Sequence, residues 1–242
     1  MYNIDDKKRI VIKVGTSTLT HKSGRQVTLV SSGAIGLGMG KMGMQNRPDE
    51  TPLKQACAAV GQCELMYIYD KLFGNYNITV AQILLTKYIL DTPRKNNVVN
   101  TFEQLFARGV IPVVNENDTV AIDELELEFG ENDTLAAHVA QFSNSDMLII
   151  LSDIDGFYDA NPKIDPNAKL IPMVTEINDD IRKLAGDAVS GLGTGGMITK
   201  INAAEMAMNA GIDMAILNGR NPDILYDLFD GKQVGTIFTA NK

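Results

Sequence analysis

Five consecutive apolar residues, Met147–Leu151, limit the possible folds of this chain more than any other feature of its sequence. The run is far too short to span a membrane as a helix, which needs about 20 apolar residues. A run this short and this apolar is typical of a strand buried on both faces of a parallel sheet. Parallel strands need crossover connections, and most such crossovers contain a helix. The run therefore predicts an α/β fold.

The rest of the sequence alternates short strands with helical stretches. Apolar residues recur at helical spacing, or the composition favours a helix, at residues 52–73, 97–108, 133–142, 197–209 and 222–229. Short β-rich runs favour strands at residues 9–14, 27–31, 78–85, 110–115, 214–217 and 234–238. We expect a three-layer αβα sandwich with a mostly parallel central sheet. A length of 242 residues with 45% hydrophobic residues fits a single domain over 1–242.

Three segments depart from this alternation. Only about a dozen residues, GTSTLTHKSGRQ, separate the first two predicted strands, and no helix fits there. Either this crossover is a bare loop or residues are missing from the chain at this point, and we favour the second. Residues 120–129, VAIDELELEF, alternate apolar and acidic residues, which predicts a half-exposed strand or hairpin projecting beyond the core. Residues 155–169 contain two prolines and predict a long surface loop.

Composition excludes several classes of function. The formal net charge of −8 and the pI of about 4.8 argue against nucleic acid or an anionic membrane as the main partner. Cys57 and Cys63 lie six positions apart on a predicted helix and point away from each other, so no disulfide is expected between them. The first nine residues contain no apolar signal sequence. We expect a cytoplasmic protein, and no histidine or cysteine spacing predicts a metal site.

The segment Ser190–Lys200, SGLGTGGMITK, is the strongest indication of a phosphate-binding function. It opens a predicted helix, and its small residues allow the backbone to approach a phosphate closely. The helix N-terminus supplies N–H donors and the positive end of the helix dipole. Lys200 lies about one turn into this helix and would add a full positive charge.

Two common nucleotide-binding motifs can be tested by spacing. A Walker A loop is excluded, since in residues 35–42 Ile35 and Met42 stand where Gly and Ser or Thr are required. The glycines of residues 191–196 fit G-x-G-x-x-G. However, they follow a helical stretch rather than the first strand, which makes a dinucleotide site improbable.

Lys13 lies inside the first predicted strand, in IVIKVG. A lysine in a buried strand is costly unless it is paired or has a function. Together with Lys200 it would form a two-lysine clamp on a phosphoryl group, because phosphoryl transfer needs charge neutralisation and positioning. Polar residues also follow four of the predicted strands, at residues 15–17, 31–33, 115–118 and 152–153. α/β proteins bind ligands at the carboxyl ends of their strands, although each group by itself could be an ordinary turn or helix cap.

These motifs together resemble the amino-acid kinase superfamily. The matching segments occur in family order and cover nearly the whole chain: IVIKVGTSTLT (10–20), VSSGAI (30–35), QACAAVGQ (55–62), QILLT (82–86), IPVVNENDTV (111–120), GENDTLAAHVA (130–140), LIILSDIDGFY (148–158) and SGLGTGGMITK (190–200). The resemblance implies the fold expected above. Members of the family often carry a C-terminal PUA domain. This chain ends at Lys242, just after the last predicted strand, so we expect none here.

The resemblance also implies roles for individual residues. Lys13 and Lys200 match the lysines that stabilise the transferring phosphoryl group, and Asp133 matches an acidic residue that orients the substrate and these lysines. The positions that match ATP-binding residues are Lys13, Gly15, Ser152, Asp153, Thr194, Gly195, Gly196, Met197, Ile198, Thr199 and Lys200. The positions that match residues binding the second substrate are Ser32, Gly33, Asn115, Asp118 and Asn132. Asp118 would supply the anion that an amino acid's ammonium group needs.

The reaction implied is ATP-dependent phosphorylation of the side-chain carboxylate of L-glutamate, with Mg²⁺ on the nucleotide, as the first step of proline synthesis. Such enzymes are commonly inhibited by proline, and we expect a homodimer or homotetramer. Two alternatives remain open. One is a family member acting on another small carboxylate or phosphate. The other is a nucleotide-binding module without catalysis, which the presence of both lysines disfavours.

Overall fold

The computed structural model describes residues 2–14, 24–86, 93–120, 132–162, 164–187 and 196–240. The chain divides into two compact units. Unit 1 comprises Met1–Val27 and Asp133–Lys242, and unit 2 comprises Thr28–Asn132. In the described residues the chain forms eight strands, and every strand pair within the two units is parallel except one. The expected α/β class with a mostly parallel sheet is therefore confirmed.

Unit 1 is built on five strands in the order β1-β5-β7-β8-β6. These strands are β1 (Arg9–Val14), β5 (Met147–Ser152), β6 (Met173–Val174), β7 (Asp213–Asn218) and β8 (Thr236–Phe238). β5 is parallel to β1 on one side and to β7 on the other, with Ile10 opposite Met147 and Met147 opposite Asp213. Residues Met147–Ile150 are fully buried. This confirms that the apolar run is a strand covered on both faces.

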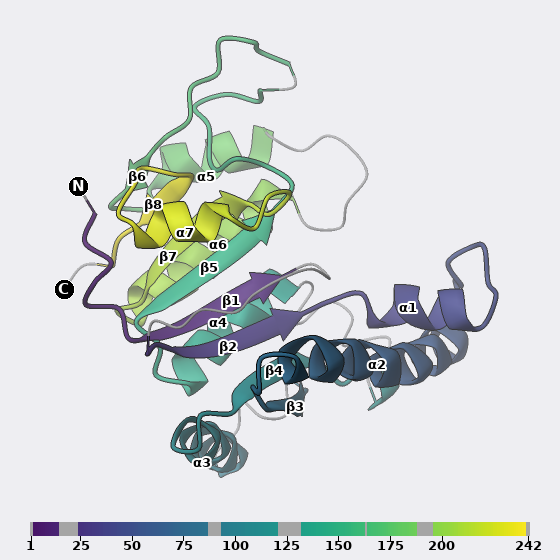
Figure 1. Cartoon of the computed structure of the whole chain (residues 1–242). Helices are drawn as coiled ribbons and strands as arrows, with labels where there is room; N and C mark the ends of the chain where they lie inside the picture. Colours follow the sequence, from purple (N-terminus) through teal and green to yellow (C-terminus); the bar gives the residue numbers. More distant parts are fainter. Residues whose placement is uncertain are drawn as a thin grey trace. The chain divides into compact units, whose positions relative to one another are not determined.

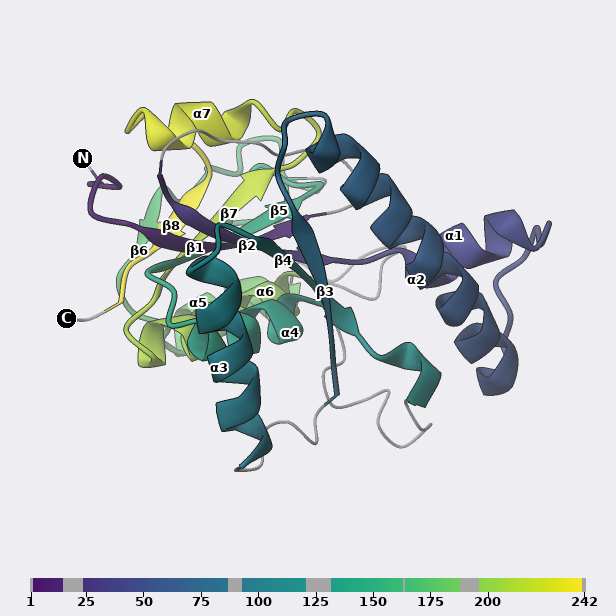
Figure 2. The ribbon, with the colours of Figure 1, turned by 60° about the horizontal axis from the view of Figure 1, so that its bottom comes forward.

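Helices cover both faces of this sheet. Unit 1 holds α5 (Asp179–Asp187), α6 (Met197–Asn209), α7 (Ile224–Phe229) and α4 (Asn132–Phe142), whose first residue belongs to unit 2. The ribbon views show α7 on one face and α4, α5 and α6 on the other (Figures 1 and 2). Unit 1 therefore has the three layers expected from the sequence.

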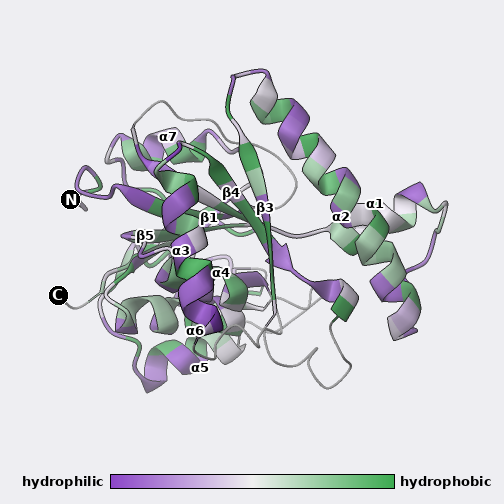
Figure 3. Ribbon diagram, turned by 90° about the horizontal axis from the view of Figure 1, so that it is seen from below, coloured by the Kyte–Doolittle hydropathy of each residue, from purple (hydrophilic) through white to green (hydrophobic). Residues whose placement is uncertain are grey.

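Unit 2 contains three parallel strands in the order β3-β4-β2. They are β2 (Gln26–Ser31), β3 (Val80–Leu85) and β4 (Ile111–Glu116), joined by the helices α1 (Ala34–Lys41), α2 (Thr51–Gly74) and α3 (Arg94–Phe106) and followed by the short 3₁₀ helix η2 (Asp118–Val120). Figure 3 shows α3 largely in hydrophilic colours. Its phenylalanines Phe102 and Phe106 are nevertheless buried. α3 is thus an amphipathic helix that packs by a narrow apolar stripe.

α1 and α2 lie side by side in unit 2 (Figure 1), with two glycines at their contact. A Cβ atom on Gly61 would lie 1.7 Å from the carbonyl oxygen of Ala34, and one on Gly38 would lie 1.8 Å from that of Cys57. No side chain larger than hydrogen fits at either position, since real Cβ atoms never approach a backbone atom so closely. The two helices therefore touch backbone to backbone, which fixes the position of Gly61 against the first turn of α1.

The structure adds elements that the sequence did not predict. α1, α5 and β6 were not expected, and the last strand, β8, runs antiparallel to β7, a direction that the expectation of a mostly parallel sheet left open. α1 contains three glycines, which weaken helix propensity, so its helical form depends on the packing against α2. Cys57 is buried and Cys63 exposed, and both are free, as their spacing predicted.

Two predictions fall on residues outside the described part of the chain. Residues 15–23, at the crossover between β1 and β2, are not described, so the question of missing residues stays open there. Val120 closes η2, and the remainder of the predicted hairpin, residues 121–129, is also outside the described ranges. Within the described part, no helix is long and apolar enough to cross a membrane.

Candidate active site

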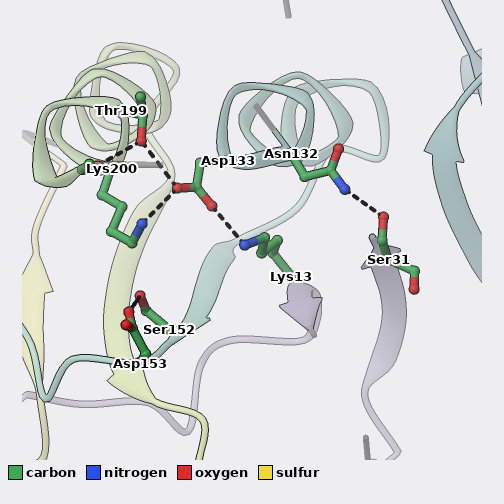
Figure 4. Close-up of polar contacts among 9 residues, drawn as sticks. Lys13, Ser31, Asn132, Asp133, Ser152, Asp153, Thr199 and Lys200 are labelled. Atoms are coloured by element: carbon green, nitrogen blue, oxygen red, sulfur yellow. Dashed lines mark hydrogen bonds and ion pairs between the residues drawn. The ribbon is translucent and has the colours of Figure 1, made fainter. Parts of the chain in front are cut away.

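In unit 1 a buried carboxylate lies between two lysines (Figure 4). Asp133, in the first turn of α4, has its Oδ1 3.2 Å from Nζ of Lys13, near the end of β1. Its Oδ2 lies 3.1 Å from Nζ of Lys200, in the first turn of α6. The side chains of Asp133, Lys200 and Lys13 are only 2%, 6% and 18% exposed. The structure thus brings together the three residues predicted to be catalytic.

Electrostatics keep this carboxylate ionised. Burial alone would raise the pKa of Asp133, but the charges of Lys13 and Lys200 and their hydrogen bonds outweigh it and hold the pKa below its ordinary value of 3.8. With Asp133 ionised, the three side chains together carry a net charge of +1. Because they are shielded from water, their attraction for an anion such as a phosphoryl group is screened little.

The N-terminus of α6 lies in the same part of unit 1. Gly196 is the N-cap of this helix, and among the described residues no side chain caps its first turn. The hydroxyl of Thr199 donates to the carbonyl of Gly196 at 2.8 Å and lies 3.4 Å from Oδ2 of Asp133. The N–H of Thr199 donates to the carbonyl of Gly196 at 3.2 Å, which leaves the N–H groups of Met197 and Ile198 as those that this turn can offer to a ligand anion. Of the other predicted ATP-binding residues, Gly15, Thr194 and Gly195 lie outside the described residues.

A second polar group lies at the carboxyl ends of β5 and β7. Ser152, the last residue of β5, is paired in register with Asn218, the last residue of β7. The hydroxyl of Ser152 donates to Oδ1 of Asp153 at 3.3 Å. Asn218 donates to Oδ1 of Asp155 at 2.6 Å, and the hydroxyl of Tyr158 donates to Oδ2 of Asp155 at 3.1 Å.

Sequence reasoning selected Ser152 and Asp153 but missed Asp155, Tyr158 and Asn218. The signal was present, because Asn218 ends a strand and Asp155 follows one closely. What the sequence did not reveal is that β5 and β7 are neighbours in the sheet.

In unit 2 the predicted substrate-binding residues lie at or just after the ends of β2 and β4, except Asn132, which begins α4. Nδ2 of Asn132 donates to the carbonyl of Ser31, the last residue of β2, at 2.7 Å (Figure 4). Ser32 follows directly, and Gly33, with φ of 94°, is the N-cap of α1. This left-handed backbone favours glycine, because a Cβ atom would be strained there. The turn after β2 is thus held by Asn132 and Gly33.

The end of β4 carries three further polar residues. Asn115 is buried, and its Nδ2 donates to Oε1 of Gln62 on α2 at 2.9 Å. Glu116, the last residue of β4, has a pKa raised to about 7 by burial and by the nearby charge of Asp118. Asp118 begins η2, which packs against α2. Gln62 and Glu116 were not predicted as site residues, although both lie within motifs that carried the family resemblance.

The chain belongs to the amino acid kinase family, whose sequence pattern matches residues 8–218. Relatives named glutamate 5-kinase match it almost from end to end. The enzyme of Clostridium perfringens is 49% identical, and the alignment covers 99% of this chain and 98% of the relative. The enzymes of Listeria innocua and Clostridium tetani are 47% and 46% identical over 99% of this chain and 96% and 97% of their own lengths. These matches confirm the family inferred from the motifs.

The alignment with the Clostridium perfringens enzyme runs over 263 positions, although this chain has 242 residues. The relative therefore has segments that this chain lacks. This agrees with the expectation that residues are missing from the chain, but it does not locate them.

Solved structures of the family share the fold. Carbamate kinase from Giardia lamblia bound to AMP-PNP superposes with a TM-score of 0.64 at 19% identity, covering 98% of this chain and all of that one. UMP kinase from Ureaplasma parvum superposes with a TM-score of 0.59 at 16% identity, covering 96% and 99%. At such low identity the likeness establishes the fold alone, and it confirms the predicted amino-acid kinase fold.

Proposed function

We propose that this chain is an ATP-dependent kinase that phosphorylates the side-chain carboxylate of L-glutamate, giving L-glutamyl 5-phosphate and ADP. This makes it a phosphotransferase with a carboxyl group as acceptor, acting at the first step of proline synthesis. The observation that carries the proposal is the buried cluster of Lys13, Asp133 and Lys200 in a chain that full-length glutamate 5-kinases match at 46–49% identity.

The lysine cluster suits phosphoryl transfer to a carboxylate. The acceptor needs no general base, since a glutamate side chain with an ordinary pKa of about 4.3 is already ionised at neutral pH. The barrier comes from bringing an anion to a phosphoryl group and from the charge spread over the phosphoryl oxygens. Lys13 and Lys200 would neutralise that charge, and Asp133, whose lowered pKa keeps it ionised, would hold both ammonium groups in place.

The nucleotide would be held by the remaining predicted positions in unit 1. The first turn of α6, residues Gly196–Lys200, would offer the N–H groups of Met197 and Ile198, the hydroxyl of Thr199 and the ammonium of Lys200 to its phosphates. Gly15, Thr194 and Gly195 are proposed to extend this cradle. Ser152 and Asp153 are proposed to contact the nucleotide at the end of β5.

The amino acid would be held by the residues at the strand ends of unit 2. Asp118 supplies the anion that the α-ammonium group requires, and Asn115, Asn132, Ser32 and Gly33 supply hydrogen-bonding groups. Two of these groups are already positioned, since Asn132 is bonded to Ser31 and Asn115 to Gln62.

Mg²⁺ is the metal that a kinase of this kind uses on the nucleotide phosphates. Among the described residues no group of three or more His, Cys, Asp or Glu side chains could hold a metal ion. The carboxylate of Asp133 is engaged by two lysines. The donor set therefore fits a Mg²⁺ ion carried by the nucleotide rather than one caged by the protein.

We further propose that the enzyme acts in the cytoplasm as a homodimer or homotetramer and that proline inhibits it. These three points rest on the family resemblance. The two free cysteines are compatible with a reducing compartment. Neither nucleic acid nor a membrane is proposed as a partner.

The proposal is tested by measuring ADP release from ATP with L-glutamate, acetylglutamate, aspartate, UMP and carbamate. We expect turnover with L-glutamate. Turnover only with another acceptor would assign the chain to a different member of the family, and ATP binding without any turnover would identify a regulatory module.

The role of Lys200 is tested in the same assay. Lys200→Ala should lower kcat by about 100-fold or more, because a charge in contact with the transferring group is lost. Lys41→Ala is the matched control, since the Lys41 side chain is exposed and forms a surface ion pair with Glu64. Full kcat in Lys200→Ala would contradict the assigned role.

A further inference from the structure

Gln62 on α2 has a buried amide nitrogen with no acceptor among the described residues. The residue is only 8% exposed, and its Nε2 is almost fully buried with no hydrogen-bond partner among the described residues. Its Oε1, by contrast, accepts a hydrogen bond from Nδ2 of Asn115 at 2.9 Å. A buried N–H group without a partner is costly, whereas Leu or Met would fill the same volume without that cost. An apolar side chain would remove this cost but would leave the buried Nδ2 of Asn115 without its acceptor.

The orientation of this amide follows from the backbone. The N–H of Glu116 can only donate, and it lies 3.0 Å from Oδ1 of Asn115. That contact identifies the oxygen of Asn115 and leaves its Nδ2 to donate toward Gln62. The atom of Gln62 that meets Asn115 must then be its oxygen. The free Nε2 is therefore fixed by a chain of hydrogen bonds that starts at the end of β4.

Two contacts place Gln62 among the proposed substrate-binding residues of unit 2. Gly61, the preceding residue, touches the backbone of Ala34 so closely that no Cβ atom would fit. Ala34 directly follows Ser32 and Gly33. On its other side Gln62 is bonded to Asn115. The amide therefore lies between the turn after β2 and the end of β4, and the helix that carries it also packs against η2, which begins at Asp118.

We propose that Nε2 of Gln62 donates a hydrogen bond to the α-carboxylate of the amino-acid substrate and is a specificity-determining residue. The inference rests on the proposed function, since it assumes that the substrate is an amino acid with a free α-carboxylate. At the non-reacting end, such a substrate presents an ammonium group and a carboxylate. Asp118 complements the ammonium, and the amide N–H of Gln62 complements the carboxylate.

A neutral donor suits this end of the substrate. The α-carboxylate keeps its charge throughout the reaction, so it needs a fixed partner rather than the full positive charge that a transferring phosphoryl group needs. Glu116 and Asp118 are acidic residues close to each other at the end of β4, and their negative charge disfavours the binding of the substrate's α-carboxylate nearby. The amide donor of Gln62, held in place by Asn115, offsets this repulsion. It therefore favours the substrate over analogues in which the α-carboxylate is replaced by an uncharged group.

The test compares two substrates in wild type and Gln62→Met, which keeps the side chain's length but removes the donor. The substrates are L-glutamate and L-isoglutamine, in which the α-carboxylate is a carboxamide. Gln62→Met should raise KM for L-glutamate about 10- to 100-fold, the usual effect of losing a hydrogen bond to a charged group. It should leave kcat and KM for ATP within a few-fold. The preference for L-glutamate over L-isoglutamine should fall about tenfold.

Thr28→Val is the matched control. Thr28, on β2, is fully buried, and its hydroxyl also lacks a partner among the described residues. It is not a proposed site residue, so this variant should leave both KM values unchanged. Gln62→Leu is the second test variant, because its side chain removes the donor and, unlike that of glutamate, cannot be protonated to regain one. It should raise KM for L-glutamate about as much as Gln62→Met.

The outcomes separate the inference from the proposed function. If wild type does not phosphorylate L-glutamate, the proposed function fails. If wild type is active and either folded variant keeps the wild-type preference for L-glutamate over L-isoglutamine, the assignment of Gln62 is overturned. An equal loss with both substrates would also overturn it, since that result means a structural role. Circular dichroism identifies the folded variants, and Gln62→Leu decides the question if Gln62→Met does not fold.

Discussion

Replacing Asp133 by asparagine removes the charge that holds two buried lysines together. At 3.1–3.2 Å each ion pair has a Coulomb energy of about 5 kcal/mol at an effective dielectric constant of about 20, before the cost of desolvation is subtracted. The net effect is better judged from buried ion pairs that lose one partner, which are destabilised by about 3–5 kcal/mol because a charge is left unpaired. The side chain of Lys200, only 6% exposed, has little access to water that would replace Asp133.

We therefore expect Asp133→Asn to lower the free energy of unfolding at pH 7 by about 3–5 kcal/mol, a large part of the total of about 5–15 kcal/mol of a typical domain. For a chain of this size this corresponds to a fall in Tm of roughly 6–20 °C. Urea and thermal unfolding should be followed by circular dichroism, because the protein contains no tryptophan. Asp230→Asn is the control, since the Asp230 side chain is 66% exposed and 4.0 Å from Lys232.

The pH dependence adds an independent check. The pKa of Asp133 in the folded protein lies below its ordinary value of 3.8, so its ionisation stabilises the folded state above that value. This contribution is lost as the pH falls through the folded-state pKa. The difference between wild type and Asp133→Asn should therefore be largest near neutral pH and shrink in acid. A variant as stable as wild type at pH 7 would refute the reasoning from the buried lysines.

Two further predictions concern unit 2. Gly38→Ala places a Cβ atom 1.8 Å from the carbonyl oxygen of Cys57 and should destabilise the protein by about 1–3 kcal/mol or more. Gly40→Ala on the same helix is the control, because its Cβ atom meets nothing within 4 Å, and it should be neutral or stabilising by up to about 1 kcal/mol. Equal Tm values for the two variants would contradict the close contact of α1 and α2. Glu116 has a pKa raised from 4.5 to about 7, so the folded state holds its proton more tightly than the unfolded state, and its contribution to stability falls as the pH rises from about 4.5 to about 7. Glu116→Gln should lack this fall, and its stability relative to wild type should increase between pH 4 and pH 8 in urea titrations; a constant difference would count against the raised pKa.

Several elements were predictable from local sequence alone. The strand β5 was predictable because a run of only five consecutive apolar residues is typical of a strand covered on both faces. The helix α6 was predicted with its observed bounds, Met197–Asn209, because a glycine-rich segment precedes a helical apolar pattern. Lys13 and Lys200 could be selected as candidates because a lysine is unexpected inside a buried strand and useful at a helix N-terminus.

Other features depended on contacts between distant segments. α1 was missed because its three glycines lower the local helix propensity. Gly38 is favourable there only because α2 packs so closely against it that no side chain would fit. The antiparallel pairing of β8 with β7 could not be inferred either, since strand composition does not encode direction. In the same way, the pairing of Ser152 with Asn218 on neighbouring strands could be recognised only from the register of β5 and β7.

The sequence by itself determined which residue types this protein has available for binding phosphate and an amino acid, because motifs and periodicity are local properties of the chain. The tertiary structure alone decided that Asp133 stands between two lysines 120 and 67 positions away, and that the amide oxygen of Gln62 accepts a hydrogen bond from Asn115. These arrangements depend on which strands and helices become neighbours. Which elements become neighbours depends on the packing of the whole core and on the pairing of buried charges and hydrogen bonds. Both involve residues far apart in the sequence, so no short segment determines them.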